Sequence, residues 1–168
     1  AHVIRTCRPQ IIFNAAAWTD VDRAEHEYTL ADAVNASAAG LMAALAQCSH
    51  ALMVHFSTDY VFSGERRRPY TEQDATGPLS AYGCSKLAGE HAVQEQDDSA
   101  IIIRTGWVYS ARRSNFVTKI LSALTRGQEV PVVTDQVGTP TSAVLIARVM
   151  AQMFSSYLSG DGHVRPQS

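Results

Sequence analysis

The sequence is poor in the residues and patterns that mark several large classes of protein. It contains only three cysteines, Cys7, Cys48 and Cys84, which are far apart and form no C-x-x-C motif. Such cysteines do not make a disulfide framework, so we expect reduced thiols and a cytoplasmic location. The formal net charge is only −2, without a long run of either sign. This excludes a nucleic-acid-binding protein that depends on clustered positive charge.

Patterns typical of metal-binding and membrane-spanning proteins are also missing. The six histidines have no zinc-ligand spacing and no paired cysteines near them, so no metal-binding residue is assigned. The longest apolar stretches are shorter than ten residues, whereas a membrane-spanning helix needs about 20. We therefore expect neither a membrane nor a nucleic acid as a partner.

Short apolar runs alternate with segments of helical periodicity along the chain. The predicted strands are residues 11–13, 51–56, 100–104 and 130–133, and Pro131 indicates a sheet edge for the last of them. The predicted helices are residues 28–47, 80–96, 115–126 and 142–154, with Ser80 as an N-cap and Gly127 as a C-terminal stop. Strands rich in Ile and Val that alternate with helices are typical of buried parallel sheets. The predicted fold class is therefore α/β, a partial Rossmann-like doubly wound parallel sheet.

Small or polar residues follow three of the predicted strands. These clusters are residues 15–17, 57–60 and 105–109. In open parallel sheets, ligands bind at the carboxyl ends of the strands. The positions of the clusters alone therefore predict a ligand-binding site at this edge of the sheet.

Tyr82 and Lys86 are four residues apart near the start of a predicted helix, so their side chains lie on one helix face. A lysine ammonium and the positive end of a helix both favour the phenolate form of a nearby tyrosine. Thr58, at the end of the preceding strand, can offer a hydroxyl to the same substrate oxygen. A hydroxyl, a tunable phenol and a lysine together suit the reduction of a ketone or the oxidation of an alcohol.

The same residues allow a purely structural interpretation. A lone Tyr-x-x-x-Lys is a weak motif, and Tyr82 and Lys86 could be a packing residue and a solvated charge. The strand-end sequence Ser57-Thr58-Asp59 upstream of the pair favours the catalytic interpretation.

Several strings of this sequence match a known family in order and spacing. Residues 57–64, Ser-Thr-Asp-Tyr-Val-Phe-Ser-Gly, resemble the STDYVFDG motif of the dTDP-4-dehydrorhamnose reductases. These are members of the extended short-chain dehydrogenase/reductase family. Further strings that look like the family's are residues 14–25, 82–90, 104–109, 115–117 and 135–142. The resemblance extends from Pro9 to Met150 and so covers nearly the whole chain.

The resemblance implies the reduction of dTDP-4-dehydro-6-deoxy-L-mannose to dTDP-L-rhamnose. In this interpretation Tyr82 is the general acid that protonates the C4 carbonyl oxygen. Lys86 binds the nicotinamide ribose and lowers the pKa of Tyr82, while Thr58 polarises the carbonyl. The residues implied to line the sugar pocket are Val21, Thr58, Asp59, Tyr60 and Trp107. Those implied to lie along the cofactor are Ala15, Ala16, Ala17, Thr19, Asn35, Ser57, Tyr82 and Lys86.

The family also implies the cofactor and the partners. NADPH is the expected cofactor, with NADH as an alternative, and Mg²⁺ is known in the full-length family without any ligand that can be assigned here. The expected partner is the dTDP-sugar substrate, and the full-length family allows a homodimer.

Two other functions fit parts of the pattern. The first is another sugar-nucleotide epimerase, dehydratase or reductase, but Asp59 is followed by Tyr60 and not by the glutamate typical of the dehydratases. The second is a non-catalytic regulatory subunit on the same fold, like the beta subunit of methionine adenosyltransferase. Thr58, Tyr82 and Lys86 are all present, which argues against that subunit.

The ends of the chain suggest an incomplete domain. The sequence starts with Ala1, almost directly before a predicted strand, and it contains no Gly-rich phosphate loop, which the family carries near its N-terminus. We interpret residues 1–158 as an incomplete NAD(P)-binding Rossmann-like domain with the catalytic residues, and residues 159–168 as a loop or truncated end.

We predict that these 168 residues alone bind NADPH poorly. The backbone N–H groups of the Gly-rich loop hold the pyrophosphate in this fold, and this chain contains no such loop. Isothermal titration calorimetry of the isolated chain with NADPH measures the affinity, and tight binding would contradict the prediction.

Overall fold

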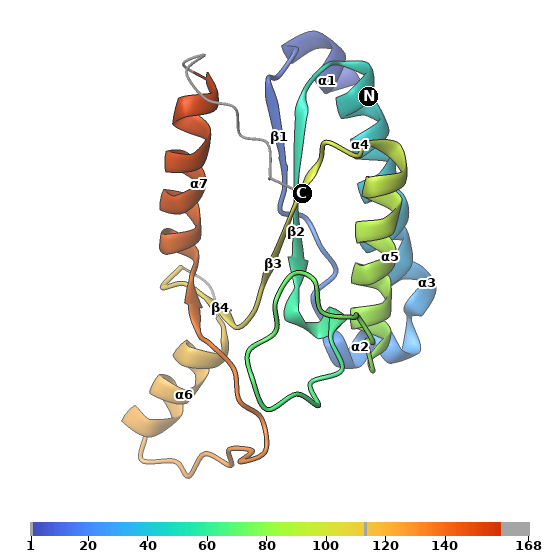
Figure 1. Ribbon diagram of the computed structural model, residues 1–168. Helices are drawn as coiled ribbons and strands as arrows, with labels where there is room; N and C mark the ends of the chain where they lie inside the picture. The colour runs from blue at the N-terminus through green and yellow to red at the C-terminus, as the bar shows by residue number, and fades with distance from the viewer. Residues whose placement is uncertain (1, 113, 159–168) are drawn as a thin grey trace. The chain divides into compact units, whose positions relative to one another are not determined.

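The computed structural model describes residues 2–112 and 114–158, which Figure 1 shows as coloured ribbon. The chain divides into two compact units, residues 1–104 and residues 105–168. The predicted loop at 159–168 lies outside the described residues, and the predicted domain boundaries stay predictions.

The first unit is built on a three-stranded sheet in the order β1-β2-β3. Its strands are β1 (Ile11–Asn14), β2 (Leu52–Thr58) and β3 (Ile101–Thr105). β1 and β2 are parallel, and their register pairs Ile11 with Leu52 and Asn14 with His55. Nearly every residue of β2 is buried, as expected for a central strand without polar alternation. The predicted α/β class with a parallel sheet is confirmed.

Helices connect these strands and cover the sheet. They are α1 (His2–Cys7), α2 (Val21–His26), α3 (Tyr28–Asp32), the π-helical turn η1 (Ala33–Ser37), α4 (Ala38–Cys48), the 3₁₀ turn η2 (Asp59–Val61) and α5 (Ala81–Gln96). α4 and α5 lie side by side against the sheet (Figure 1). The predicted helices 28–47 and 80–96 are confirmed. Ser80 is the N-cap of α5, as predicted, and its side chain accepts a hydrogen bond from the Gly83 N–H. α1 and α2 were not predicted.

The core of this unit depends on small side chains. Ala39, Ala43 and Ala46 of α4 are fully buried and pack with Met53 of β2 and Val93 of α5. Alanine lets helix and sheet backbones approach closely while still removing apolar surface from water. The helical run Tyr28–Cys48 is also long and apolar enough to cross a membrane by length and composition. Its contacts with α5 and β2 are those of a helix in a protein core.

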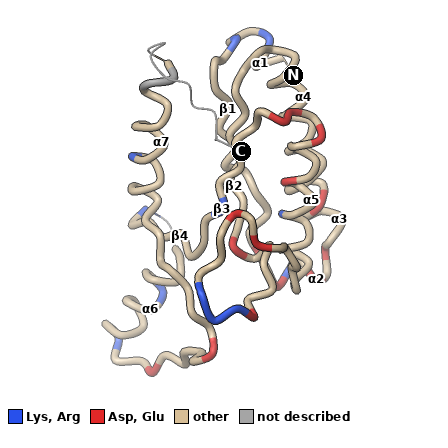
Figure 2. The backbone as a smooth tube through the Cα atoms, in the orientation of Figure 1, with Lys and Arg blue, Asp and Glu red and all other residues tan. Residues whose placement is uncertain are grey.

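A loop after η2 is held by its own charges. Arg66 and Arg68 both form ion pairs with Asp74, at 2.6 and 2.7 Å, and Asp74 also accepts from the Thr71 N–H. The basic segment of this loop is visible as a continuous blue stretch in Figure 2. Tyr70 stacks on Phe62, with 4.3 Å between ring centroids. These contacts give an exposed loop a defined conformation beside the end of β2.

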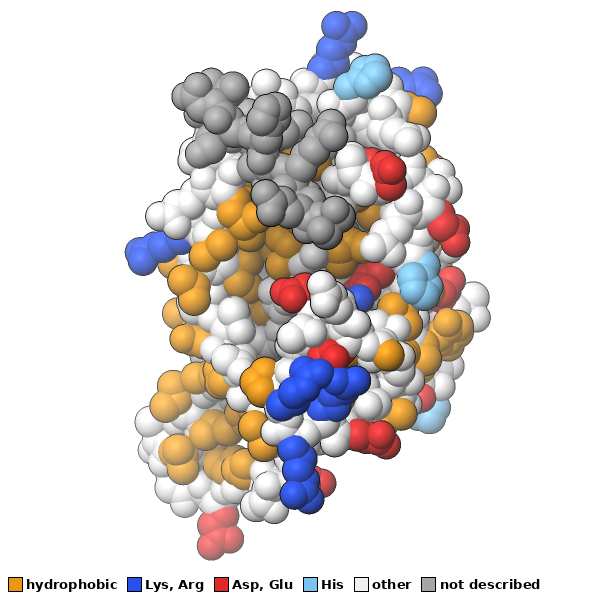
Figure 3. All heavy atoms as spheres, in the orientation of Figure 1, with side chains coloured by type: hydrophobic (Ala, Val, Ile, Leu, Met, Phe, Trp, Pro, Cys, Tyr) orange, Lys and Arg blue, Asp and Glu red, His pale blue; other side chains and the backbone are white. Residues whose placement is uncertain are grey.

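The second unit contains a two-stranded parallel pair and two helices. Its elements are β4 (Val108–Tyr109), α6 (Phe116–Thr125), β5 (Thr141–Ser142) and α7 (Ala143–Leu158). Asn115 caps α6 in a reciprocal capping box with Thr118, and Gly127 follows the helix with a φ of 67°. Figure 3 shows apolar side chains gathered on the surface of α6, where Phe116, Leu121 and Leu124 are exposed.

The predicted strand at residues 130–133 is wrong. The chain is irregular there, and Val132 and Val133 are more than half exposed. Pro131 lacks a backbone N–H and so cannot complete a ladder. The partner of β4 is instead β5, whose two residues were predicted as a loop and the start of a helix.

Gly89 provides a test of the close approach between α5 and the helical run before α4. A Cβ at this position would overlap the backbone oxygen of Asn35, which cannot move without deforming η1. We predict that Gly89→Ala destabilises the protein by about 3 kcal/mol, since overpacking outweighs the helix-propensity gain of up to about 1 kcal/mol.

Urea denaturation measures this loss. Gly77→Ala is the matched control, because its Cβ would meet only the Ser63 Cβ at 3.9 Å. Equal midpoints for Gly89→Ala and the unaltered protein would refute the proposed contact.

Candidate active site

The parallel pairing of β1 and β2 brings two polar strand ends to one edge of the sheet. Asn14 ends β1 and Thr58 ends β2. The segment 15–19 continues from Asn14 and holds four predicted cofactor residues. Among these, Ala15, Ala16 and Thr19 are exposed and Ala17 is half-buried. A row of small, accessible residues therefore lies at the edge where ligands bind in this fold.

Tyr82 lies in the first turn of α5 and is 9% exposed. Glu25 helps to position this turn, because its carboxylate accepts a 2.8 Å hydrogen bond from the Ala81 N–H at the positive helix terminus. Val21 and Trp18 pack against the cluster that contains Tyr82. The Tyr60 ring meets the Tyr82 ring edge to face, at 5.7 Å between centroids. The structure thus brings Val21, Tyr60 and Tyr82 together, and their predicted roles toward the sugar and the cofactor stay predictions.

Burial has the largest effect on the pKa of the Tyr82 phenol. Burial raises the pKa of Tyr82, while a side-chain hydrogen bond with Thr58 lowers it and the charge of Asp59 raises it. The net effect is a raised pKa. Lys86 is not among the groups that shift the pKa of Tyr82, so its predicted lowering of this pKa stays a prediction. The raised pKa keeps the phenol protonated at neutral pH, which is the state that a general acid needs.

Lys86 is 1% exposed, and its side chain reaches the backbone of β2. Its Nζ donates to the Phe56 carbonyl oxygen at 2.7 Å and lies 3.5 Å from Nε2 of His55. Burial lowers the pKa of Lys86 to about 8, against the opposite effect of the nearby Glu90 carboxylate. The pKa of Lys86 is therefore close enough to neutral pH for this side chain to lose its proton.

Asn35 connects the segment 15–19 to α5. Its Oδ1 accepts from the Trp18 N–H at 2.8 Å, and its Nδ2 donates to the Trp18 carbonyl and to Ser85 Oγ. Ser85 in turn donates to the Tyr82 carbonyl at 2.8 Å. Asn35 lies in η1 and is only 1% exposed. It therefore acts by positioning the segment that contains Trp18, and its own side chain does not reach the surface.

Asp59 and Ser57 flank Thr58 with different environments. Asp59 is exposed, yet desolvation by neighbouring atoms raises its pKa, while a hydrogen bond from the Thr58 hydroxyl, at 3.2 Å, lowers it. Ser57 is 6% exposed. Among the described residues that are not exposed, its Oγ is the one buried side-chain polar atom without a hydrogen-bond partner. A buried hydroxyl without a hydrogen-bond partner destabilises the folded protein unless a ligand or water supplies the missing hydrogen bond.

Trp107 belongs to the second unit. It adopts a left-handed backbone conformation with a φ of 49°. Its ring packs against Phe116, at 5.4 Å between centroids, and lies so close to Gly138 that a Cβ there would overlap the indole. The predicted role of Trp107 in the sugar pocket stays a prediction.

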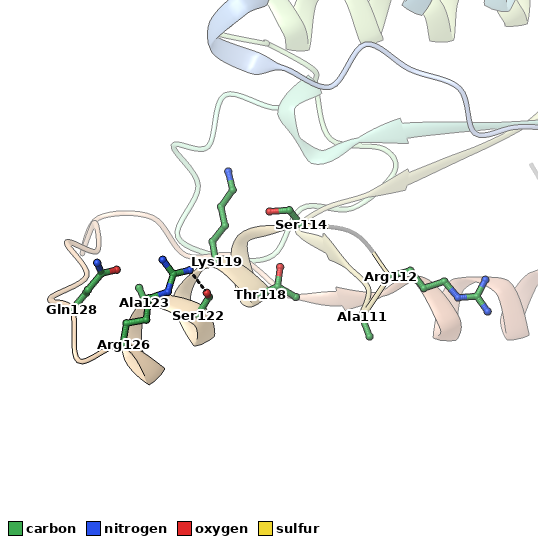
Figure 4. A pocket seen from close by; sticks show the side chains of 9 residues that line it. All are labelled: Ala111, Arg112, Ser114, Thr118, Lys119, Ser122, Ala123, Arg126 and Gln128. Atoms are coloured by element: carbon green, nitrogen blue, oxygen red, sulfur yellow. Dashed lines mark hydrogen bonds between the residues drawn. The ribbon is translucent and has the colours of Figure 1, made fainter.

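An open hollow of about 590 Å³ also lies in the second unit. Figure 4 shows its lining side chains, with Arg126 hydrogen-bonded to Ser122. Arg112, Lys119 and Arg126 give it a basic character, and none of the predicted site residues lines it. Over residues 2–112 and 114–158, no three His, Cys, Asp or Glu side chains come together to hold a metal ion.

Sequence reasoning missed two residues of the site. His55 lies in an otherwise apolar strand, between Val54 and Phe56, and is completely buried. Asn14 contacts it across the sheet, with 3.0 Å from Nδ2 to Nδ1. A histidine inside a buried apolar run was a visible signal, because polar side chains are rarely buried without partners.

The parallel sheet, with Thr58 at the end of β2 and with Tyr82 and Lys86 one turn apart on α5, is typical of a Rossmann-like protein of the short-chain dehydrogenase/reductase class. The family model described as "RmlD substrate binding domain" matches residues 1–163, so the chain belongs to this family.

Named relatives support the same assignment. The dTDP-4-dehydrorhamnose reductase of Escherichia coli K12 is 45% identical over 88% of this chain and 49% of its own length. The "Probable low-salt glycan biosynthesis reductase Agl14" of Haloferax volcanii is 40% identical over 94% of this chain and 54% of its own. A crystal structure of dTDP-4-dehydrorhamnose reductase from Bacillus anthracis in complex with NADP superimposes with a TM-score of 0.88, at 38% identity over 92% of this chain and 55% of that one. The chain thus spans about half the length of the relatives it matches.

The buried His55 predicts an acid-sensitive stability. Burial first, and then the charge of Lys86, lower the pKa of His55 from 6.5 to about 4. Between these values the unfolded chain binds a proton that the folded chain excludes, so stability falls as the pH falls from 6.5 to 4. The expected loss is about 3 kcal/mol, at about 1.4 kcal/mol per pKa unit.

Urea titrations between pH 7 and 4 measure this slope. His55→Asn removes the group and should flatten the slope, whereas the matched control His91→Asn, at an exposed position of α5, should leave it unchanged. An unchanged slope in His55→Asn would show that His55 is not responsible.

Proposed function

We propose that the protein containing this chain is a reductase that converts dTDP-4-dehydro-6-deoxy-L-mannose to dTDP-L-rhamnose with NADPH. The observation that carries the proposal is the buried Tyr82, whose raised pKa keeps its phenol protonated and is affected by the Thr58 side chain, with Lys86 one helical turn further along α5. The relative from E. coli bears this activity in its name, and the names of the relatives support a reductase in general.

The residues present fit the nicotinamide half of a dinucleotide. Ala15 and Ala16 expose small side chains at the strand edge, and Ser57 offers a buried hydroxyl without a partner. Lys86 would bind this half of the cofactor through its ammonium group. Asn35 would contribute indirectly, because it positions the segment that contains Trp18. A bound NADPH would supply the hydride. NADP is present in the B. anthracis structure, which favours NADPH over NADH.

The roles of the chain's own groups follow from their protonation. Tyr82, kept protonated by its raised pKa, gives its phenolic proton to the C4 oxygen of the substrate. Thr58 donates a hydrogen bond to the same oxygen and so polarises the carbonyl. Val21, Asp59 and Tyr60 line the sugar pocket next to the reacting group.

Two further roles rest on the resemblance to the family alone. It assigns Thr19 to the cofactor, after the alanines, and Trp107 to the deoxysugar. We place the reaction in the cytoplasm, because the free cysteines of the described residues, Cys7, Cys48 and Cys84, are exposed thiols. A homodimer is the assembly that we propose for the whole protein.

A dehydratase or epimerase is the alternative enzyme. Tyr60 argues against a dehydratase. It follows Asp59 directly, at the position where an elimination would need a second acid, and its ring packs on Tyr82. A non-catalytic subunit is disfavoured because Thr58, Tyr82 and Lys86 are all buried, and a purely structural role does not need these three groups.

We predict that Tyr82→Phe lowers kcat for the reduction by about 10²- to 10⁴-fold, because the proton donor is lost. The measurement is the disappearance of NADPH absorbance with dTDP-4-dehydro-6-deoxy-L-mannose as substrate, using the intact gene product. Tyr28→Phe is the matched control, since Tyr28 is 44% exposed on α3, and it should retain full activity. A Tyr82→Phe enzyme with more than about a tenth of the normal kcat would exclude Tyr82 as the general acid.

A further inference from the structure

His55 is a completely buried histidine in the middle of the sheet, and the proposed reaction leaves it without a role. A buried imidazole is unfavourable unless its nitrogens have partners. Both nitrogens of His55 do have polar neighbours. Nδ1 lies 3.0 Å from Asn14 Nδ2, and Nε2 lies 3.5 Å from Lys86 Nζ. His55 therefore stands between the end of β1 and the lysine of the site.

The direction of this contact follows from Asn14. Its Oδ1 accepts a hydrogen bond from the Ala16 N–H at 3.2 Å, so its Nδ2 is the atom that faces His55. An amide nitrogen can only donate, so Nδ1 of His55 must accept. A neutral imidazole that accepts at Nδ1 carries its proton on Nε2, and this proton faces Lys86.

The Nε2–H group changes the balance between the two states of Lys86. The ammonium form cannot accept a hydrogen bond, and it already donates to the Phe56 carbonyl oxygen at 2.7 Å. The neutral amine has a lone pair and can accept from Nε2–H. His55 therefore favours the neutral form of Lys86, in the same direction as the burial that lowers the pKa of Lys86.

Other charged groups around Lys86 act against this effect. Glu90, one turn further along α5, raises the pKa of Lys86. The Glu90 carboxylate is itself held by Arg104 of β3 through hydrogen bonds of 2.6 to 3.2 Å, which weakens its attraction for Lys86. Tyr82 shares the same helix face but stays protonated and uncharged at neutral pH. The state of Lys86 is thus set by burial and His55 on one side and by Glu90 on the other.

We propose that Ala16 N–H, Asn14 and His55 form a relay of hydrogen bonds that links the cofactor segment 15–19 to the neutral form of Lys86 and makes His55 a positioning residue for this lysine. The role as a relay to a cofactor-binding lysine rests on the proposed function, but the relay itself is a property of the folded chain. A change in the Ala16 backbone would reach Lys86 through Asn14 and His55, without direct contact between the segment and the lysine.

The histidine tautomer tests the relay independently of activity. Long-range ¹H–¹⁵N spectra of the intact gene product with labelled histidine distinguish Nε2–H from Nδ1–H rings, and loss of the signal in His55→Asn identifies His55. The relay requires the Nε2–H tautomer at pH 7. An Nδ1–H or doubly protonated ring would overturn the proposal. In Asn14→Asp, where a carboxylate can only accept, the proton should appear on Nδ1.

The titration of Lys86 tests the consequence. Labelled lysine in the intact gene product gives a signal for Lys86, and the exposed Lys119 gives an internal reference. Lys86→Arg identifies the Lys86 signal. We expect its midpoint near pH 8 in the unaltered protein and at least one pH unit higher in His55→Asn, which keeps the contact to Asn14 but withdraws Nε2–H. The exposed control His91→Asn should leave the midpoint unchanged.

A conservative variant separates the relay from loss of packing. His55→Gln keeps a buried amide N–H within reach of Lys86, and its midpoint should lie between those of the unaltered protein and His55→Asn. Equal midpoints in all variants would overturn the relay. Should both variants fail to fold, the ring whose proton moves to Nδ1 in Asn14→Asp identifies His55, and its tautomer in the unaltered protein still decides. If Tyr82→Phe keeps its activity while the tautomer is as expected, the proposed function fails and the relay stands.

Discussion

The parallel register of β1 with β2 is the constraint on which the site depends. Because Asn14 is paired with His55, both strands deliver their last residues to one edge of the sheet. The segment after β1 and the Ser57-Thr58-Asp59 sequence after β2 then lie where an open parallel sheet binds its ligands. A shift of one residue would turn Asn14 and His55 to opposite faces of the sheet, and the hydrogen bonds that reach Lys86 would be lost with them.

The same region combines apolar packing with an unusual amount of buried polarity. Ala39, Ala43 and Ala46 allow α4 to approach the sheet and α5, and this close packing encloses Asn35, His55 and Lys86. Enclosure makes each hydrogen bond electrostatically stronger and each missing one more costly. Burial also shifts the pKa values of Tyr82 and Lys86 in opposite directions. It raises the pKa of Tyr82, so that the phenol keeps its proton, and it lowers the pKa of Lys86, so that the ammonium group loses its proton more easily.

Much of this could be predicted from local sequence. Strands β1, β2 and β3 were visible as runs of Ile, Val and Met, and Ser80 was visible as a helix cap, because these signals depend on neighbouring residues only. The Tyr82–Lys86 pair was visible because helical spacing places them on one face. Features that depend on distant residues were not. The pairing of β4 with β5 joins segments more than 30 residues apart, and the local β propensity of Val132 and Val133 pointed to the wrong strand. The direction of the pKa shift of Tyr82 depends on how deeply the fold buries it, which no local pattern reports.

The π-helical turn Ala33–Ser37 has a consequence for the length of the chain between β1 and β2. Such a turn contains a wider backbone loop than the α-helix around it, and it aims Asn35 at both Trp18 and Ser85. Removing one residue from it would restore a regular helix but rotate everything that follows by about 100°, as the α-helical repeat of about 3.6 residues requires. The alanine face of α4 would then turn away from α5, and Asn35 would lose Trp18. Among related sequences that keep this site, insertions and deletions are therefore expected in the exposed loop around Arg66 and Asp74, and not in the segment from Tyr28 to Cys48.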